Sequence, residues 1–308
     1  MAYTLDDVIE ATQALLHGHT GQDEQLTYLT TAITSTSTSL QLGSVEGLRR
    51  GIIEIEDELL WVDSVDTISK TVTIAPFGRG YRGTTAAAHV ANLVPVKMNP
   101  LLPRYRVRQA INETINAVSG DLFGVSNNTI QFNSGQVAYE LPLPEFGEIL
   151  DIISLSWNTE NTTEAWIPVR RWRYSVQSNL TYFPSGHSVE IFDPIRNGVD
   201  VNVVYTTSPQ PFPIDADGSN PFSETTLPES CFDVVTYGAA ARLAWAIEGG
   251  RNNQTGVSSN VLADGYGSNW RQSASAIAKE LYAFHLARLE NERDLLLRNT
   301  QPVINFQR

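Results

Sequence analysis

The sequence predicts an α+β fold, a helical bundle of four helices with two β-rich insertions. Four segments carry apolar residues at helical spacing, and two longer segments between them alternate apolar with polar residues. Clusters of glycine and proline separate these segments. Because every amphipathic helix needs a partner for its apolar face, the four helices are expected to pack together.

The expected elements divide the 308 residues into six parts. These are an N-terminal bundle helix, a first β-rich domain, a second bundle helix, a second β-rich domain with a proline-rich linker, the C-terminal bundle helices, and a C-terminal tail. Their boundaries, in the same order, are 1–20, 21–100, 101–125, 126–227, 228–299 and 300–308.

The first helix is expected over Thr4–Leu16, where Thr4 and Asp7 have the spacing of a capping box. Gly18 and Gly21 follow its last apolar residue and are expected to end it. Residues 26–96 are expected to be β, most clearly where isoleucines alternate with Glu54 and Glu56. Alternation places these two carboxylates on one face, which we expect to be solvated.

The second helix is expected over Pro103–Leu122, with proline at a favourable helix start. Residues 129–205 contain short apolar runs between turns, which predict the second β region. Residues 208–228 hold five prolines, too many for regular structure, and are expected to form the linker.

The third helix is expected over Cys231–Glu248, with the pair Gly249–Gly250 ending it. Its small-sided centre would let another helix approach closely. The fourth helix is expected over Ser273–Asn299. Its inward stripe is expected to contain Ile277, Leu281, Phe284, Arg288 and Leu295.

Composition excludes several classes of protein. The net charge of −13 argues against unaided wrapping of DNA, because phosphate repels an acidic chain. The single cysteine, Cys231, permits neither an intramolecular disulfide nor a cysteine-based zinc site. No run approaches the roughly 20 apolar residues of a membrane span. We therefore expect a soluble protein made in the reducing cytoplasm of a cell.

Motifs for catalysis or cofactor binding fail on inspection, so the prediction is no enzyme, no catalytic residue, no cofactor and no metal. His17-Gly18-His19 lacks a third ligand nearby. The stretch from Asp215 has glycine at its fourth position, where a calcium loop needs it at the sixth, and Thr226 at its twelfth, where a calcium loop needs glutamate. Gly78–Gly83 fits the letters Gly-x-Gly-x-x-Gly, but no βαβ unit surrounds it.

Two arginine groups are unusual in an acidic chain and are candidates for partner contact. One group opens the second helix, where the helix dipole disfavours cations, and the other lies in the second β region. An acidic surface of a neighbouring subunit or DNA phosphate would be the partner, and simple solvent exposure is the alternative. The groups are Arg104, Arg106 and Arg108, and Arg170, Arg171 and Arg173.

Aromatic residues of the second β region allow two interpretations. They could form a platform for a glycan, or they could pack in the core, as aromatic residues of half-buried strands usually do. The residues concerned are Trp157, Trp166, Trp172, Tyr174 and Tyr182.

Two motifs resemble proteins of tailed bacteriophages. An Arg-Gly, Gly-Thr, Ala-rich, His stretch resembles neck and tail proteins of phage virions, and a small-sided helix resembles the helical part of head-to-tail adaptor (connector) proteins. The first motif comprises Arg79, Gly80, Arg82, Gly83, Thr84 and His89, and the second comprises Gly238, Ala239, Ala240 and Arg242.

The resemblance implies a structural virion protein, a ring at the head–tail junction beneath the portal protein. Such a ring extends the DNA channel, lets genomic DNA pass without sequence-specific binding, and docks the next neck protein, a stopper or tail terminator. Its C-terminal tail would reach into the portal through Pro302, Val303, Ile304 and Phe306.

Two other functions stay open at this point. The first is a tail or baseplate protein whose second β region binds a glycan receptor through its aromatic residues. The second is a virion glycan hydrolase, which would need paired carboxylates in a cleft.

Overall fold

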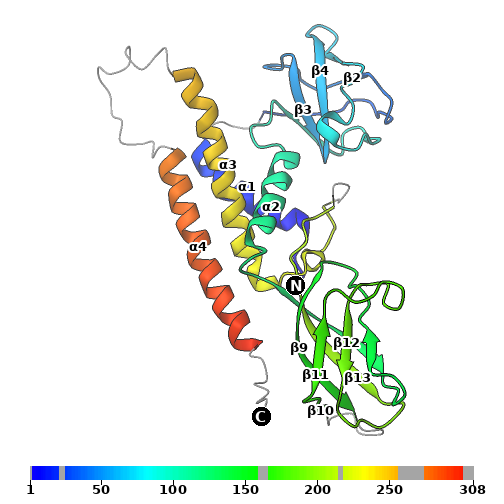
Figure 1. The fold of residues 1–308 in the computed structure, drawn as a ribbon. Helices are drawn as coiled ribbons and strands as arrows, with labels where there is room; N and C mark the ends of the chain where they lie inside the picture. The colour runs from blue at the N-terminus through cyan, green and yellow to red at the C-terminus, as the bar shows by residue number, and fades with distance from the viewer. Residues whose placement is uncertain (1, 21–24, 159–165, 214–217, 256–273, 301–308) are drawn as a thin grey trace.

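The computed structural model describes residues 2–20, 25–158, 166–213, 218–255 and 274–300, and Figure 1 shows their arrangement. Within these ranges the chain is mostly β, with 13 strands in three sheets and 4 α-helices. The predicted fold class, a helical bundle with two β-rich insertions, is therefore wrong. Each β-rich segment encloses a hydrophobic core of its own, so the sheets are units in their own right beside a third, helical core.

The helices share one hydrophobic core, in which α3 packs against each of the other three. Helices α3 and α4 lie side by side and antiparallel, with α2 on the other side of α3 and α1 crossing behind α3 in this view (Figure 1). The bounds are α1 (Leu5–Thr20), α2 (Arg104–Val118), α3 (Phe232–Thr255) and α4 (Ala274–Asn299).

The helix ends show which local signals operate. The capping box is confirmed, because the Thr4 amide donates to Asp7 Oδ2 at 2.8 Å and the Asp7 amide donates to Thr4 Oγ1 at 3.3 Å. The expected stops at Gly18 and at Gly249–Gly250 are wrong, since α1 continues past Gly18 and α3 continues past Gly249–Gly250, whereas α1 ends at Thr20, directly before the second expected stop, Gly21. A glycine within a helix costs only about 1 kcal/mol relative to alanine, so it does not end a helix by itself.

The first β unit is a curled six-stranded sheet with the strand order β1-β6-β3-β4-β5-β2. Beyond the edge strands, Leu29 forms an antiparallel bridge with Leu42, which brings the two edges together around the core. The first and last strands along the chain, β1 and β6, pair with each other, and Gln25 lies opposite Met98. The strands are β1 (Gln25–Tyr28), β2 (Ser39–Gln41), β3 (Gly51–Ile55), β4 (Glu58–Asp66), β5 (Thr71–Ile74) and β6 (Pro95–Met98).

The second β unit has one sheet of order β10-β9-β13-β7 and another of order β11-β12-β8, which share a hydrophobic core. Strand β7 stands at one edge and pairs with β13 along its whole length. The strands are β7 (Gly124–Gln131), β8 (Ala138–Glu140), β9 (Ile149–Asn158), β10 (Trp166–Pro168), β11 (Trp172–Ser175), β12 (Ser188–Ile191) and β13 (Asp200–Thr207).

The proline-rich linker is packed onto the helices. Phe222 is fully buried in the helical core, and Thr4 forms a bridge with Pro221. Short 3-10 turns form η2 (Phe222–Thr225) and η3 (Glu229–Cys231), and a third, η1 (Tyr81–Gly83), lies in the first β unit.

Helix α2 separates the two β units along the chain. Strand β6 precedes its N-terminus and β7 follows its C-terminus, so the units sit toward opposite ends of the helical layer (Figure 1). In the described part of the chain, no helix is both long enough and apolar enough to cross a membrane.

Candidate protein-binding site

The motif of Arg79 to His89 folds as part of a strap, Gly78–His89, over the hairpin of β3 and β4. Glu58, the first residue of β4, is 1% exposed and receives the strap. The Arg79 guanidinium donates to both Glu58 carboxylate oxygens, at 2.7 and 2.9 Å. The backbone amides of Gly80 and Ala87 donate to the same carboxylate at 3.1 Å each. One buried carboxylate therefore holds the strap at both ends.

His89 completes this buried cluster. Its Nε2 lies 2.9 Å from Glu58 Oε2, and its Nδ1 lies 2.9 Å from Glu56 Oε2. The remaining Arg79 donors bind backbone carbonyls, including that of Ser37 at 3.0 Å. Arg79 and His89 of the motif thus close the first β unit rather than facing a partner.

The glycines of the motif serve its turn. Gly80 has φ of 58°, and a side chain there would meet the backbone of the residues around Thr84. Thr84 Oγ1 accepts the Leu59 amide at 3.1 Å and donates to the Tyr81 carbonyl at 3.0 Å. Residues 84–88 after the turn form no helix, unlike the phosphate-binding arrangement that Gly-x-Gly-x-x-Gly suggests.

The expectation of a solvated acidic face is wrong for Glu54, which like Glu58 is 1% exposed. Both faces of the hairpin are covered, one by the core and the other by the strap and the start of α2. The alternation of apolar and acidic residues in the strand does not reveal that the strap and the start of α2 bury its second face.

The cluster predicts a stability optimum in mildly acidic solution. Burial alone would raise the pKa of Glu58, but hydrogen bonds from His89, Arg79 and the Ala87 and Gly80 amides lower it to about 2. Hydrogen bonding to Glu58 raises the pKa of His89 despite burial. The contribution of Glu58 is present above its ordinary pKa of 4.5 and is lost as pH falls toward 2. The contribution of His89 is present below pH 6.5 and is lost as pH rises through its folded pKa.

Urea unfolding from pH 2 to pH 9 measures this dependence. The free energy of unfolding is expected to be highest between roughly pH 4.5 and 6.5 and to fall on both sides. In the His89→Gln variant the fall above pH 6.5 should be weaker. A wild-type stability that rises steadily from pH 6.5 to 9 would contradict the assignment.

Arg104 joins the first β unit to the helices. Its backbone amide donates to Glu54 Oε1 at 2.5 Å, and its Nε donates to Asp57 Oδ1 at 2.7 Å. The guanidinium also pairs with Asp6 of α1. Burial, assisted by the neighbouring charge of Arg108, lowers the pKa of Arg104. The carboxylates of the β3–β4 hairpin thus offset the unfavourable position of this cation at a helix N-terminus.

The other arginines differ in their surroundings. Arg171 pairs with Asp193 at 2.9 Å and Arg173 pairs with Glu190 at 2.7 Å, both on the surface, where such pairs contribute little. The Arg106 and Arg170 side chains are exposed, and Arg108 is partly buried. For these arginines contact with a partner stays a prediction.

The small-sided motif of Gly238 to Arg242 lies where three helices meet. A side chain added at Gly238 of α3 would lie 2.8 Å from His285 Nδ1 of α4 and closer still to Thr114 Cγ2 of α2. Ala239 and Ala240 are fully buried in the helical core. Arg242 Nε donates to Thr114 Oγ1 at 3.1 Å. The small residues of this motif therefore set the spacing of α2, α3 and α4.

Helix α4 has its polarity partly inverted. Its buried face holds His285, whose Nδ1 donates to the Val234 carbonyl at 2.9 Å, and Glu292, which accepts from Ser230 Oγ at 2.6 Å. Its exposed side chains include five large apolar ones, Tyr282, Phe284, Leu286, Leu295 and Leu297.

The expected inward stripe of α4 is therefore wrong at two of its positions. Phe284 is 50% exposed and Leu295 is 48% exposed. The adjacent residues His285 and Leu296 take the inward positions instead. Ile277 and Leu281 of the expected stripe are buried in the helical core.

The exposed apolar side chains of α4 form two different flanks. Because a helix turns by about 100° per residue, Tyr282, Leu286 and Leu297 lie on one side of the buried face. Phe284 and Leu295 lie on the other side. On the first flank Tyr282 and Trp245 of α3 border a hollow of about 370 Å³. On the second flank Phe284 contacts Tyr237 with ring centroids 5.8 Å apart.

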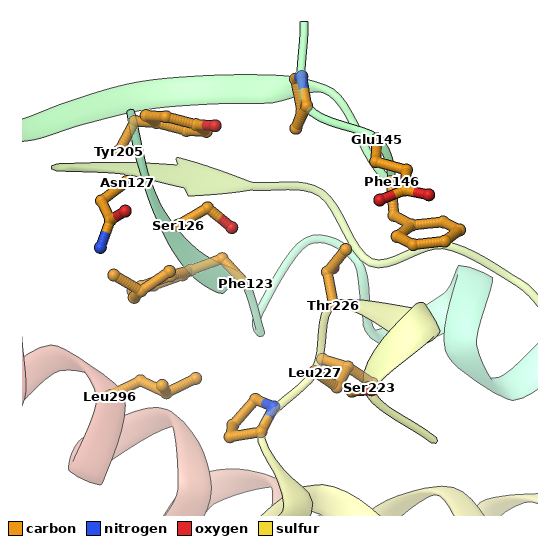
Figure 2. Close-up of a pocket in the computed structure, with 13 residues that line it drawn as sticks. Phe123, Ser126, Asn127, Glu145, Phe146, Tyr205, Ser223, Thr226, Leu227 and Leu296 are labelled. Atoms are coloured by element: carbon orange, nitrogen blue, oxygen red, sulfur yellow. The ribbon is translucent and has the colours of Figure 1, made fainter. Parts of the chain in front are cut away.

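A larger groove, of about 520 Å³, lies where the second β unit, the linker and α4 meet. Figure 2 shows Phe123 and Asn127 on one side of the opening, with Leu296 pointing toward them from α4. The lining is mostly apolar: Phe123, Val125, Pro144, Phe146, Leu227, Pro228 and Leu296 with Ser126, Asn127, Glu145, Tyr205, Ser223 and Thr226.

The aromatic residues of the second β unit favour core packing over a glycan platform. Trp157, Trp172 and Tyr174 pack against the core of this unit. Trp166 and Tyr182 are exposed, but Trp166 belongs to β10 in one sheet, whereas Tyr182 lies between β11 and β12 of the other.

Some predictions fall outside the described residues. The tail residues Pro302, Val303, Ile304 and Phe306 are among them, as is the loop at Asp215. Among the described residues no group of three or more His, Cys, Asp or Glu is arranged to hold a metal ion.

Sequence reasoning did not single out Trp245 and Tyr282, which border the hollow, or the groove residues. No signal in the sequence marks them, because they are brought together only by the packing of α3 on α4 and by the approach of α4 to the linker and the second β unit. Comparison with known proteins adds no further candidate: the chain matches no family model, and no curated protein matches it.

Proposed function

We propose that this chain is a head-to-tail adaptor of a tailed bacteriophage, a structural subunit of a ring beneath the portal. The partly inverted polarity of α4 carries the proposal. Isolated apolar residues are common on protein surfaces, but a concentration of them on one helix, with His285 and Glu292 inside, supports a protein-binding surface.

A neighbouring copy of this chain is the partner that best fits α4. A two-fold dimer needs one self-complementary patch, whereas a ring needs two different patches on each subunit. Helix α4 has two such patches, and they differ in shape. One flank holds the hollow beside Trp245 and Tyr282, and the other exposes the side chains of Phe284 and Leu295.

The positions of the β units support contacts above and below the ring. They lie toward opposite ends of the helical layer (Figure 1), so one would face the portal and the other the next neck protein, a stopper or tail terminator. The net charge of −13 supports a channel wall past which genomic DNA slides without binding.

Copy number in the virion is the first test. Quantitative mass spectrometry of purified particles is expected to give about one chain per portal subunit. A large excess would point to the tail tube or capsid surface, and a small fraction to the tail tip. Absence from the particle would overturn the structural role itself.

A charge on either flank of α4 is expected to prevent ring formation. Tyr282→Asp and Phe284→Asp each place an unpaired carboxylate in the proposed interface, which should lower incorporation into particles at least about tenfold. Both side chains are half exposed in the single chain, so circular dichroism should stay unchanged.

Ala117→Asp is the matched control for these two variants. It adds the same charge at an exposed apolar residue of α2, outside α4 and outside both β units, and should be incorporated normally. Incorporation of the α4 variants at the level of this control would sink the lateral-contact assignment.

A further inference from the structure

The groove of about 520 Å³ borders an open strand edge. Strand β7 is the last strand of its sheet and pairs with β13 on one side. Within the described ranges no strand pairs with its other side. Val125, Ser126 and Asn127 of β7 line the groove, and Val125 is 47% exposed. Unpaired backbone groups beside an apolar surface form a ready site for an added strand.

The end of α4 brings a suitable segment to this site. Leu296 lines the groove, and the Thr300 amide donates to the Leu296 carbonyl at 2.9 Å, so Thr300 still belongs to the last turn. Residues 301–308 begin one position later. Eight extended residues span at most about 28 Å. Tethering so near the groove gives the segment an effective concentration in the millimolar range, so even weak contacts suffice.

The chemistry of this segment matches the groove. Val303 and Ile304 are β-branched residues that favour strands, and Phe306 adds a large apolar side chain. In an extended segment Ile304 and Phe306 share one face, which can cover Phe123 and Leu296. Burial of this face removes apolar surface of both the groove and the segment from water.

We infer that residues 301–308 dock in the groove of their own chain, as an added strand beside β7. The tail is thereby covered before assembly, and joining a portal requires it to leave the groove. This second step rests on the proposed function, whereas docking in the free chain does not.

Disulfide trapping in the full chain tests the docking. Ser126→Cys and Ile304→Cys are combined, while the native Cys231 is buried and burial raises its pKa to about 12, which keeps it out of exchange. Under mild oxidation the pair is expected to form a disulfide within one chain. The rate should be at least about tenfold that of Ser156→Cys with Ile304→Cys, because Ser156 lies on β9 away from the groove.

Two outcomes would overturn the inference. Disulfides formed mainly between chains would mean that the groove binds the tail of a second copy. A rate of disulfide formation equal to that of the Ser156 control would mean that residues 301–308 do not occupy the groove. Adding Val125→Asp should reduce trapping strongly, whereas Val137→Asp, which changes a similarly exposed valine outside the groove, should not.

Portal binding separates the inference from the proposed function. The trapped chain should fail to bind purified portal rings, and reduction should restore binding. If trapping succeeds but the reduced chain does not bind portals, docking stands and the adaptor role fails. If trapping fails but the chain binds portals, the adaptor role stands and the docking is wrong.

Discussion

Replacing Arg79 with alanine is expected to lower the free energy of unfolding by about 3–5 kcal/mol, the largest effect of any single change described here. Glu58 would lose two hydrogen bonds of 2.7 and 2.9 Å while staying buried. A buried carboxylate that loses the guanidinium and keeps only His89 as a charged partner must either remain charged at high cost or take up a proton.

The measurement is urea unfolding at pH 7, with Arg82→Ala as the control. Arg82 lies in the same strap, but its side chain is exposed, so its removal should cost less than about 0.5 kcal/mol. Adding Glu58→Gln to Arg79→Ala should recover part of the loss, because the buried charge is then gone. Equal small losses in both arginine variants would show that the strap does not close the first β unit.

Gly238→Val is expected to cost about 3 kcal/mol and to move α4 away from α3. The first added carbon would lie 2.8 Å from His285 Nδ1, a ring atom fixed by its 2.9 Å hydrogen bond to the Val234 carbonyl. Thr114 of α2 blocks the other direction, so no flexible side-chain end can yield.

Gly120→Ala is the control, because an added carbon there meets nothing within 4 Å. It should leave the free energy of unfolding within about 0.5 kcal/mol of the wild type. If the proposed ring forms, Gly238→Val should also impair incorporation into it even under conditions where the chain stays folded, since the hollow between α3 and α4 would change shape. A stable Gly238→Val variant would mean that the helices are not in close contact at this position.

Local signals in the sequence predicted single helices and strands better than they predicted which of these pack together. The capping box of α1 and the alternation around Ile53 and Ile55 depend on neighbouring residues alone, and the structure has a helix and a strand there. The fold class failed because it required knowing which segments share a core. Short strands pair with partners far along the chain, as when β2 joins β5, and no single-segment pattern reveals such pairing.

The candidate site was predicted only in part, for the same reason. The two motifs were found by resemblance, but their physical roles depend on distant partners, Glu58 for Arg79 and Thr114 for Gly238. The stripe of α4 was misplaced because apolar residues occur on both sides of that helix. His285, a polar residue among apolar ones, faces inward because it donates a hydrogen bond to the Val234 carbonyl of α3. The sequence of α4 alone does not reveal this distant partner.

The pairing of Gln25 with Met98 makes the first β unit an exchangeable module. Its entry and exit strands are neighbours, so the unit could be deleted, enlarged or replaced between α1 and α2 without altering the distance that the chain must bridge. Among the described residues, the contacts of Arg104 with Glu54 and Asp57 tie it to the helices. Related chains could therefore diverge in this unit while conserving the helical layer, and a protein engineer could graft a reporter or affinity domain at the same junction.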